Sequence, residues 1–314
     1  MLQYLVVLLD DTSVSFCHYQ NNEGVKKLIS LDDLKQAIRF GMMENLYIQF
    51  VYPSIPLPSE YLEVIETIDH CKILPYRLKH EGNNVYVLDN WEDLTKAKYG
   101  EMFVFRTSKS MLFSHYSDLI EAVKRGCIVN LVILDVDTFN EKDFISYKSI
   151  LSQMVNDFGR MVDKDEMPQL NIVTDRLILK QMNNCGAGSK SVTLAPNGKF
   201  YVCPAFYYED TEESVGDLNS GLNIRNKQLY ELLHAPICSH CDAYHCKRCV
   251  WLNRKTTLEV NTPSHEQCVV AHLERNASRE LLELIKAKGK NISRMAEIDE
   301  IDYLDPITKH REWQ

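Results

Sequence analysis

The 314-residue sequence lacks several features that would place it in a common class of protein. It has no apolar stretch near the 18 residues that a transmembrane helix needs, so we expect no membrane span. With only 10 prolines and 12 glycines it is not collagen-like, and 45% hydrophobic residues exclude a wholly disordered chain. The 35 basic residues are outnumbered by 44 acidic ones, a net charge of −9, which argues against nucleic-acid or anionic-membrane binding.

The sequence also lacks the usual motifs of nucleotide-binding and hydrolytic enzymes. It contains no glycine-rich phosphate loop, no dinucleotide-binding G-x-G-x-x-G, no G-x-S-x-G and no H-E-x-x-H. The N-terminal run MLQYLVVLLDD has no preceding Lys or Arg, and Asp10 and Asp11 follow the apolar residues at once, which is not typical of a secretory signal. We therefore expect a cytoplasmic protein under reducing conditions.

The first 180 residues alternate apolar, β-rich runs with helical patterns. Such alternation predicts βαβ units around a parallel sheet that is covered on both faces. We predict strands at residues 3–9, 46–51, 71–75, 102–105, 127–134 and 170–174. We predict helices at residues 31–44, 59–69, 91–98, 111–125 and 141–160, the first capped by Ser30. Five or six such units would form an open, partial β/α barrel or a doubly wound sheet.

Polar residues at two predicted strand ends are candidates for chemistry in this half. Asp10 and Asp11 end the first strand, and Asp135 and Asp137 end the fifth. Strand ends are where α/β folds place ligands, so these carboxylates could bind a cation or a peptide amine. The ordinary alternative is that they cap helices and solvate loops. Cys17 follows the first strand as a potential ligand or nucleophile, although a lone cysteine in apolar sequence is more often a small buried residue.

Cysteine, in contrast, is abundant and unevenly distributed. Seven of the ten cysteines fall between residues 185 and 268. Their spacing is Cys185-x12-Gly198-x4-Cys203, then 34 residues, then Cys238-x2-Cys241-x4-Cys246-x2-Cys249, then 18 residues to Cys268. Dense cysteine in a reducing compartment indicates metal binding or redox activity rather than disulfides, and an odd number cannot pair completely.

The segments around these cysteines have predictable local structure. Between Cys185 and Cys203, the run SVTLAPNGKFYV predicts a hairpin with a tight turn at Asn197-Gly198, which would bring the two flanking cysteines together. Residues 225–234 predict a short helix, and 264–288 predict an amphipathic helix packed on the cysteine region. The acidic run 297–305 is either a docking segment for a Cys-rich or basic peptide or a solvated tail.

The spacing of the central cysteines favours a pair of metal centres. Only four residues separate the two C-x2-C knuckles, against about 15 to 20 in zinc ribbons. Seven thiolates divide as four plus three, and four cysteines are the usual ligand set of an iron–sulfur cluster. Zinc remains the alternative, because a histidine could complete a three-cysteine site. The nearby histidines are His240, His245, His265 and His272.

This region resembles the SPASM domain, a C-terminal extension of many radical SAM peptide-modifying enzymes. The resemblance lies in the run Cys185-GAGSKSVTLAPNGKFYV-Cys203-Pro204, in VGDLN at 215–219, and in the clustered cysteines. The family pattern is C-x9–15-G-x4-C, gap, C-x2-C-x5-C-x3-C, gap, C, and all seven cysteines and Gly198 have counterparts. Two central spacings are one residue shorter here, x4 for x5 and x2 for x3.

The resemblance implies two auxiliary [4Fe–4S] clusters. The ligands of one cluster would be Cys238, Cys241, Cys246 and Cys268. The ligands of the other would be Cys185, Cys203 and Cys249, and its fourth ligand varies or is absent in the family. The implied domains are a degenerate radical SAM-like β/α domain at residues 1–180, a SPASM-like iron–sulfur domain at 181–275, and a C-terminal helix and acidic tail at 276–314.

The N-terminal half resembles the partial β/α barrel of radical SAM proteins but lacks their defining motif. Those proteins hold the SAM-cleaving cluster through C-x3-C-x2-C after the first strand. The corresponding loop here, residues 10–24, contains Cys17 alone, and Cys71 and Cys127 are each more than fifty residues further on. We therefore expect no SAM cluster. In this respect the chain is similar to the CXXX repeat peptide maturase family, which is associated with ribosomal peptides carrying Cys-x-x-x repeats and with a separate radical SAM enzyme.

Three functions follow as hypotheses. The first is a maturation factor for a ribosomally synthesised peptide, which acts beside a separate radical SAM enzyme as an electron relay or as a binder of a substrate thiolate. The second is a peptide-binding adaptor with structural zinc or iron–sulfur sites and no redox role. The third is an independent enzyme that uses a substrate-bound cluster, for which the sequence offers no identified base or nucleophile. The expected partners are a precursor peptide and a radical SAM maturase, with no nucleic acid and no membrane.

Overall fold

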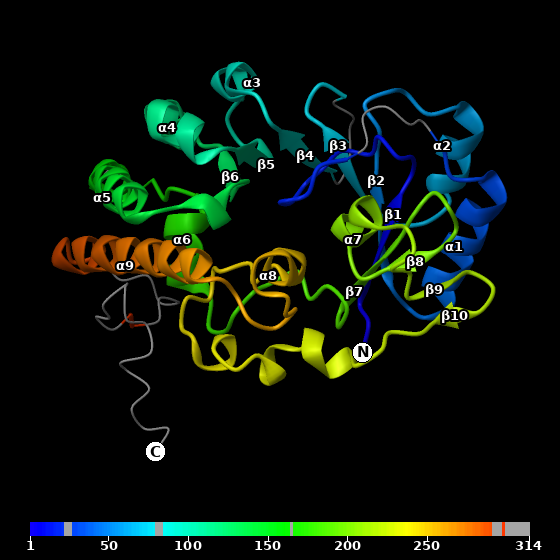
Figure 1. The fold of residues 1–314 in the computed structure, drawn as a ribbon. Coiled ribbons are helices and arrows are strands. Elements are labelled where there is room, and N and C mark those ends of the chain that lie inside the picture. Colours follow the sequence, from blue (N-terminus) through cyan, green and yellow to red (C-terminus); the bar gives the residue numbers. More distant parts are fainter. Residues whose placement is uncertain (22–26, 79–83, 164–165, 291–296, 299–314) are drawn as a thin grey trace. The chain divides into compact units, whose positions relative to one another are not determined.

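The computed structural model describes residues 1–21, 27–78, 84–163, 166–290 and 297–298. The chain forms two compact units, whose elements are labelled in Figure 1. The first unit comprises Met1–Val87 and Cys185–Ala235, and the second comprises Leu88–Asn184 and Pro236–Gln314. Both units combine helices with strands, so the predicted α/β class is confirmed. These units are not the domains inferred from the SPASM resemblance, whose ranges stay a prediction.

The first unit contains a mostly parallel sheet with the strand order β4-β3-β2-β1-β7-β8. Its strands are β1 (Tyr4–Leu8), β2 (Tyr47–Val51), β3 (Cys71–Pro75), β4 (Asn84–Leu88), β7 (Ser191–Leu194) and β8 (Phe200–Tyr201). All neighbours are parallel except β7 and β8, which form the predicted antiparallel hairpin. The other elements are α1 (Leu31–Met43), α2 (Ser59–Ile65), α7 (Pro204–Glu209), the short pair β9 (Gly216–Asp217) and β10 (Gly221–Leu222), and two 3-10 turns at Lys227–Tyr230 and Leu232–His234.

Burial along β1 explains why the first unit folds around this strand. Every side chain from Leu5 to Leu9 is buried, as expected for a central parallel strand covered on both faces. On one side these residues pack against α1, whose buried face includes Leu34 and Ala37. The predicted cap is present, because the Ser30 hydroxyl accepts a hydrogen bond from the Asp33 amide at 3.0 Å. Strand β1, which precedes the loop that contains Cys17, is therefore held in place by buried packing on α1.

The second unit combines helices that pack against one another with a parallel strand pair (Figure 1). Its strands are β5 (Met102–Thr107) and β6 (Ile128–Ile133), and its longer helices are α4 (Lys109–Lys124), α5 (Glu141–Asp163), α6 (Asn171–Ile178), α8 (Val250–Thr257) and α9 (His265–Ala287). Shorter elements are α3 (Trp91–Lys96) and 3-10 turns at Val136–Thr138 and Cys238–His240. Helix α9, predicted at 264–288, lies against both α5 and α6.

One predicted strand is wrong, because residues 171–178 form α6 instead. The reason lies in Asn171, which is buried and bonded through its side chain to the strand β6. Its Oδ1 accepts from the Leu131 amide at 2.7 Å, and its Nδ2 donates to the Leu131 carbonyl at 3.1 Å. The amide side chain therefore takes the backbone groups that a further strand would have used at this position.

Three smaller predictions also need correction. Strand β4 was not predicted, and it is a short strand whose first three residues are only half-buried. The short helix predicted at residues 225–234 consists of two 3-10 turns instead of one continuous helix, with Asn226 left-handed at φ 49° just before them. In the β7–β8 turn only Gly198 has a positive φ, 76°, whereas Asn197 acts through its side chain, whose Oδ1 accepts from the Lys199 amide at 3.1 Å.

No helix among the described residues is long and apolar enough to cross a membrane. Most of the acidic run predicted as a docking segment or solvated tail, residues 299–305, lies outside the described residues.

Candidate metal centre

The four cysteines that the SPASM resemblance assigns to one cluster all lie in the second unit. Cys238 is the first residue of a 3-10 turn, and Cys241 directly follows that turn. Cys246 lies in the next loop, and Cys268 is in the first turn of α9. Burial raises the pKa of the Cys241 and Cys268 thiols to about 12, and the neighbouring cysteines, Cys246 first among them, add to the rise. The pKa of Cys238 is raised by burial and then by the same three neighbours.

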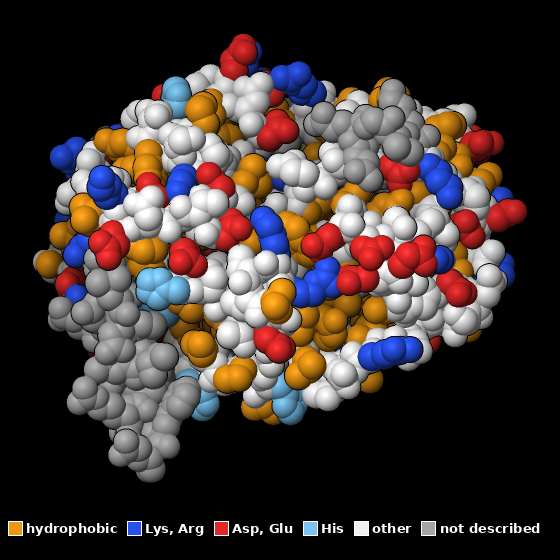
Figure 2. Space-filling view, viewed as in Figure 1, with side chains coloured by type: hydrophobic (Ala, Val, Ile, Leu, Met, Phe, Trp, Pro, Cys, Tyr) orange, Lys and Arg blue, Asp and Glu red, His pale blue; other side chains and the backbone are white. Residues whose placement is uncertain are grey.

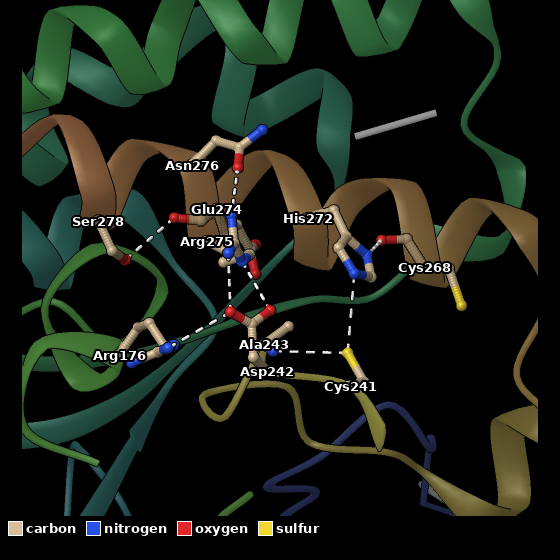
Figure 3. A network of polar contacts seen from close by, with 10 residues as sticks. All are labelled: Arg176, Cys241, Asp242, Ala243, Cys268, His272, Glu274, Arg275, Asn276 and Ser278. Carbon is tan, nitrogen blue, oxygen red and sulfur yellow. Dashed lines mark hydrogen bonds and ion pairs between the residues drawn. The ribbon is translucent and has the colours of Figure 1, made fainter. Parts of the chain in front are cut away.

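Helix α9 places Cys268 and the residues that support it on one face. Cys268, His272 and Arg275 are spaced i, i+4 and i+7, which sets them above one another along a helix. Figure 3 shows His272 between the two cysteines: its Nδ1 lies 2.6 Å from the Cys268 carbonyl oxygen, and its Nε2 lies 3.7 Å from Cys241 Sγ. Because the carbonyl can only accept, Nδ1 carries a proton, and in the neutral ring Nε2 can accept one from the Cys241 thiol.

The four-residue loop between Cys241 and Cys246 is anchored to the same helix by Asp242. Both Asp242 oxygens accept hydrogen bonds from Arg275, from Nε and Nη2, each at 2.7 Å (Figure 3). Arg176 of α6 adds a weaker contact at 3.4 Å. The Arg275 side chain is fully buried, so this bidentate pair fixes the loop in a region of low dielectric.

The other end of the loop is anchored by Glu274. Its Oε1 accepts from the Tyr147 hydroxyl at 2.7 Å, and its Oε2 lies 3.2 Å from His245 Nε2. The side chains of both His245 and Glu274 are buried. The shortened x4 spacing is therefore held at both ends by charged or hydrogen-bonded residues of α9.

Backbone N–H groups are directed at two of the sulfur atoms. The Ala243 amide donates to Cys241 Sγ at 3.4 Å, and the Arg248 amide likewise bonds the Cys246 thiol. In each case this bond lowers the pKa of the thiol, against the larger upward effect of burial. Hydrogen bonds to sulfur of this kind stabilise thiolate ligands and tune the potential of iron–sulfur clusters.

The arrangement has consequences for which metal it suits. In the part of the chain that the structure describes, no group of three or more His, Cys, Asp or Glu side chains is placed to hold a single metal ion. Cys238 is buried, and Cys241, Cys246 and Cys268 are half-buried. Backbone amides are directed at the sulfur atoms of Cys241 and Cys246. Cysteine thiolates bind both zinc and iron–sulfur clusters, so the donor set fits either group.

The other three predicted metal-binding cysteines are divided between the two units. Cys185, which is exposed, and Cys203, which is half-buried, flank the β7–β8 hairpin of the first unit. Cys249 belongs to the second unit, where it precedes the first residue of α8. Their grouping as one ligand set stays a prediction.

The carboxylates at the strand ends have structural partners. Asp10 Oδ1 accepts from the amide and hydroxyl of Thr12, at 2.6 and 2.9 Å, and so closes the turn after β1. Asp135 Oδ1 accepts from the first amide of α4 at 2.7 Å, and Asp137 pairs with Lys255 at 3.3 Å. The ordinary alternative of capping and pairing accounts for these three side chains.

The loop after β1 packs against α7 through aromatic side chains. The Tyr207 hydroxyl donates to Asp11 Oδ1, and both residues are buried. Tyr208 stacks on Tyr19 with ring centroids 5.5 Å apart. Sequence reasoning missed this contact, although the adjacent tyrosines just after Cys203-Pro204 were a visible signal. These contacts join the described part of the loop after β1 to α7.

Sequence reasoning also missed Asp242, Glu274 and Arg275. Their signal was a charged residue within the cysteine loop and two charged residues on the helix face that carries Cys268. A charge on the buried face of an amphipathic helix needs a partner, but the sequence does not reveal which one.

Comparisons with known proteins show the fold. No family model and no curated protein matches the sequence. Among solved structures, polyhistidine-tagged anSMEcpe with bound AdoMet matches with a TM-score of 0.63 at 10% identity, over 93% of this chain and 97% of that one. Native anSMEcpe with bound AdoMet matches with a TM-score of 0.59 at 10% identity, over 90% and 97%. The chain therefore shares the α/β fold of anSMEcpe, and a cysteine-rich region is present in its C-terminal part, as predicted.

Proposed function

We propose that this protein is a maturation factor for a ribosomally synthesised, cysteine-containing peptide and that it acts beside a separate radical SAM enzyme. The observation that carries the proposal is the cysteine loop of the second unit, which the buried pair between Arg275 and Asp242 holds on the helix of Cys268, in a chain that shares the fold of anSMEcpe. The loop after β1 contains Cys17 as its sole cysteine, so SAM cleavage belongs to the partner. The similarity to the CXXX repeat peptide maturases supports the same division of labour.

The seven cysteines have distinct roles in this proposal. Cys238, Cys241, Cys246 and Cys268 hold one [4Fe–4S] cluster, and Cys185, Cys203 and Cys249 hold a second with one iron free of protein ligands. When bound, the clusters supply one-electron transfer and an iron that can take a substrate thiolate. Asp242 and Glu274 keep the ligand loop on α9, which favours one ligand geometry in both oxidation states.

The experiment that tests this function is Cys249→Ala, with Cys17→Ala as the matched control. Modification of the precursor peptide by the partner enzyme and binding of the peptide are measured separately. We expect Cys249→Ala to lose about half of the bound iron and most of the product while peptide binding persists, and Cys17→Ala to change neither. If Cys249→Ala leaves the partner's modification intact, the electron-relay role is wrong. If it abolishes the fold, the cluster is structural, as an adaptor would require.

A further inference from the structure

A groove of about 500 Å³ lies in the first unit, between the segment that follows α7 and the β9–β10 hairpin. It is lined by residues 212–216, Ser220, Gly221, Asn223, Arg225 and Tyr230. The hairpin wall depends on Gly216, whose φ is +124°: a Cβ there would come within 2.0 Å of the Gly221 carbonyl oxygen. Only glycine allows this close approach of the two strands, so the shape of the groove is specified by the sequence.

The groove carries more negative than positive charge. Glu212 and Glu213 are exposed on one wall, against Arg225 as the basic residue among those that line it. Acidic side chains gather over the segment between α7 and β9 on the face shown in Figure 2. The hydroxyls of Ser214 and Ser220 add hydrogen-bonding groups that suit peptide amides. This chemistry fits an extended peptide with a basic side chain.

The groove adjoins the loop that carries Cys185. Tyr230 lines the groove, and its ring lies against Gly188, where a Cβ would come within 2.6 Å of the ring. Gly188 is three residues after Cys185, which is exposed. A peptide in the groove would therefore lie beside the loop of a ligand assigned to the cluster with an open iron.

We propose that this groove binds the precursor-peptide segment next to the reactive cysteine, with a Lys or Arg side chain of the peptide opposite Glu212 and Glu213. The inference rests on the proposed function, because it identifies where that peptide docks and which side chain it carries. It requires no covalent step.

The test is a binding measurement on the full chain as purified anaerobically. The probe is a fluorescein-labelled peptide, Gly-Ser-Lys-Gly-Cys-Gly-Ser, compared with the same peptide carrying Glu in place of Lys, by anisotropy at low salt. We expect the double variant E212Q/E213Q to bind the Lys peptide about five-fold more weakly, since each exposed ion pair contributes about 0.2–1 kcal/mol. Arg225→Gln should have the opposite effect and tighten the Lys peptide.

The control is E60Q/E63Q, which removes the same charge from the exposed face of α2. It should leave the affinity within two-fold of the unmodified protein. Equal loss in both double variants, equal affinity for the Lys and Glu peptides, or no effect of E212Q/E213Q would each overturn the groove. The iron content of the same samples distinguishes the two proposals. Full iron content without charge-dependent peptide binding would contradict the groove proposal alone. Charge-dependent peptide binding without iron would contradict the cluster function alone.

Discussion

The buried pair between Asp242 and Arg275 offers the sharpest test of how the ligand loop is held. Asp242→Ala would leave the guanidinium of Arg275, which is fully buried, without its bidentate partner, and would also remove the contact of Arg176 at 3.4 Å. Breaking a buried pair by removing one member costs about 3–5 kcal/mol, because an uncompensated charge remains inside the protein. Asp242 is 19% exposed, so water can partly replace it, and we expect the lower end, about 3 kcal/mol.

That loss is large against the 5–15 kcal/mol of a typical folded domain. It would be measured as the change in the free energy of urea unfolding at pH 7, followed by circular dichroism. Asp242→Asn keeps the shape and one acceptor, so its loss should be smaller. The control is Glu92→Ala, which removes an exposed pair with Lys96, with side chains 72% and 63% exposed, and should change stability by less than about 0.5 kcal/mol.

A loss below about 1 kcal/mol for Asp242→Ala would refute the reasoning, because the loop would then be held by something other than this ion pair. The same variant tests the link to the metal centre. If the pair positions Cys241, the variant should retain less iron than Asp242→Asn after identical anaerobic purification, whereas Glu92→Ala should retain all of it.

Three further predictions concern single residues. Asn171→Ala should cost about 2 kcal/mol of unfolding free energy, because the buried amide and carbonyl of Leu131 lose their partners; an unchanged urea midpoint would contradict this. Gly216→Ala should destabilise the protein more than Gly221→Ala, since a Cβ meets backbone at 2.0 Å in the first case and nothing within 4 Å in the second; equal thermal midpoints would show that the hairpin is not tightly packed. In the metal-free protein at pH 8, iodoacetamide should modify Cys268 far more slowly than free cysteine and faster as the pH rises, because a pKa of about 12 leaves it a neutral thiol; a rate equal to that of free cysteine would contradict the burial.

Much of the fold follows from local sequence signals. The capping hydroxyl of Ser30, the apolar run of β1, the turn at Gly198 and the amphipathic pattern of α9 each specify an element that the structure contains. The exception at residues 171–178 has a tertiary cause, because the side chain of Asn171 occupies the backbone groups of β6. Pattern alone cannot distinguish a short buried helix from a strand.

The candidate metal centre was predictable in its donors but not in its support. Cysteine spacing is a property of the sequence, whereas the grouping of Cys238, Cys241, Cys246 and Cys268 as one ligand set stays a prediction from the SPASM resemblance. The partners of Asp242 come from residues 66 and 33 positions away in the chain. Such pairings are set when α6 and α9 pack together, and no local pattern encodes them.

The most direct test of the proposed function is the amount of iron, acid-labile sulfide and zinc bound per chain after anaerobic purification, together with the visible spectrum. If the chain holds two [4Fe–4S] clusters, we expect about eight irons and eight sulfides per chain, with broad absorbance at about 400 nm. About two zinc ions in a colourless protein would contradict the cluster assignment, and the cysteines would then hold structural metal in a binding adaptor.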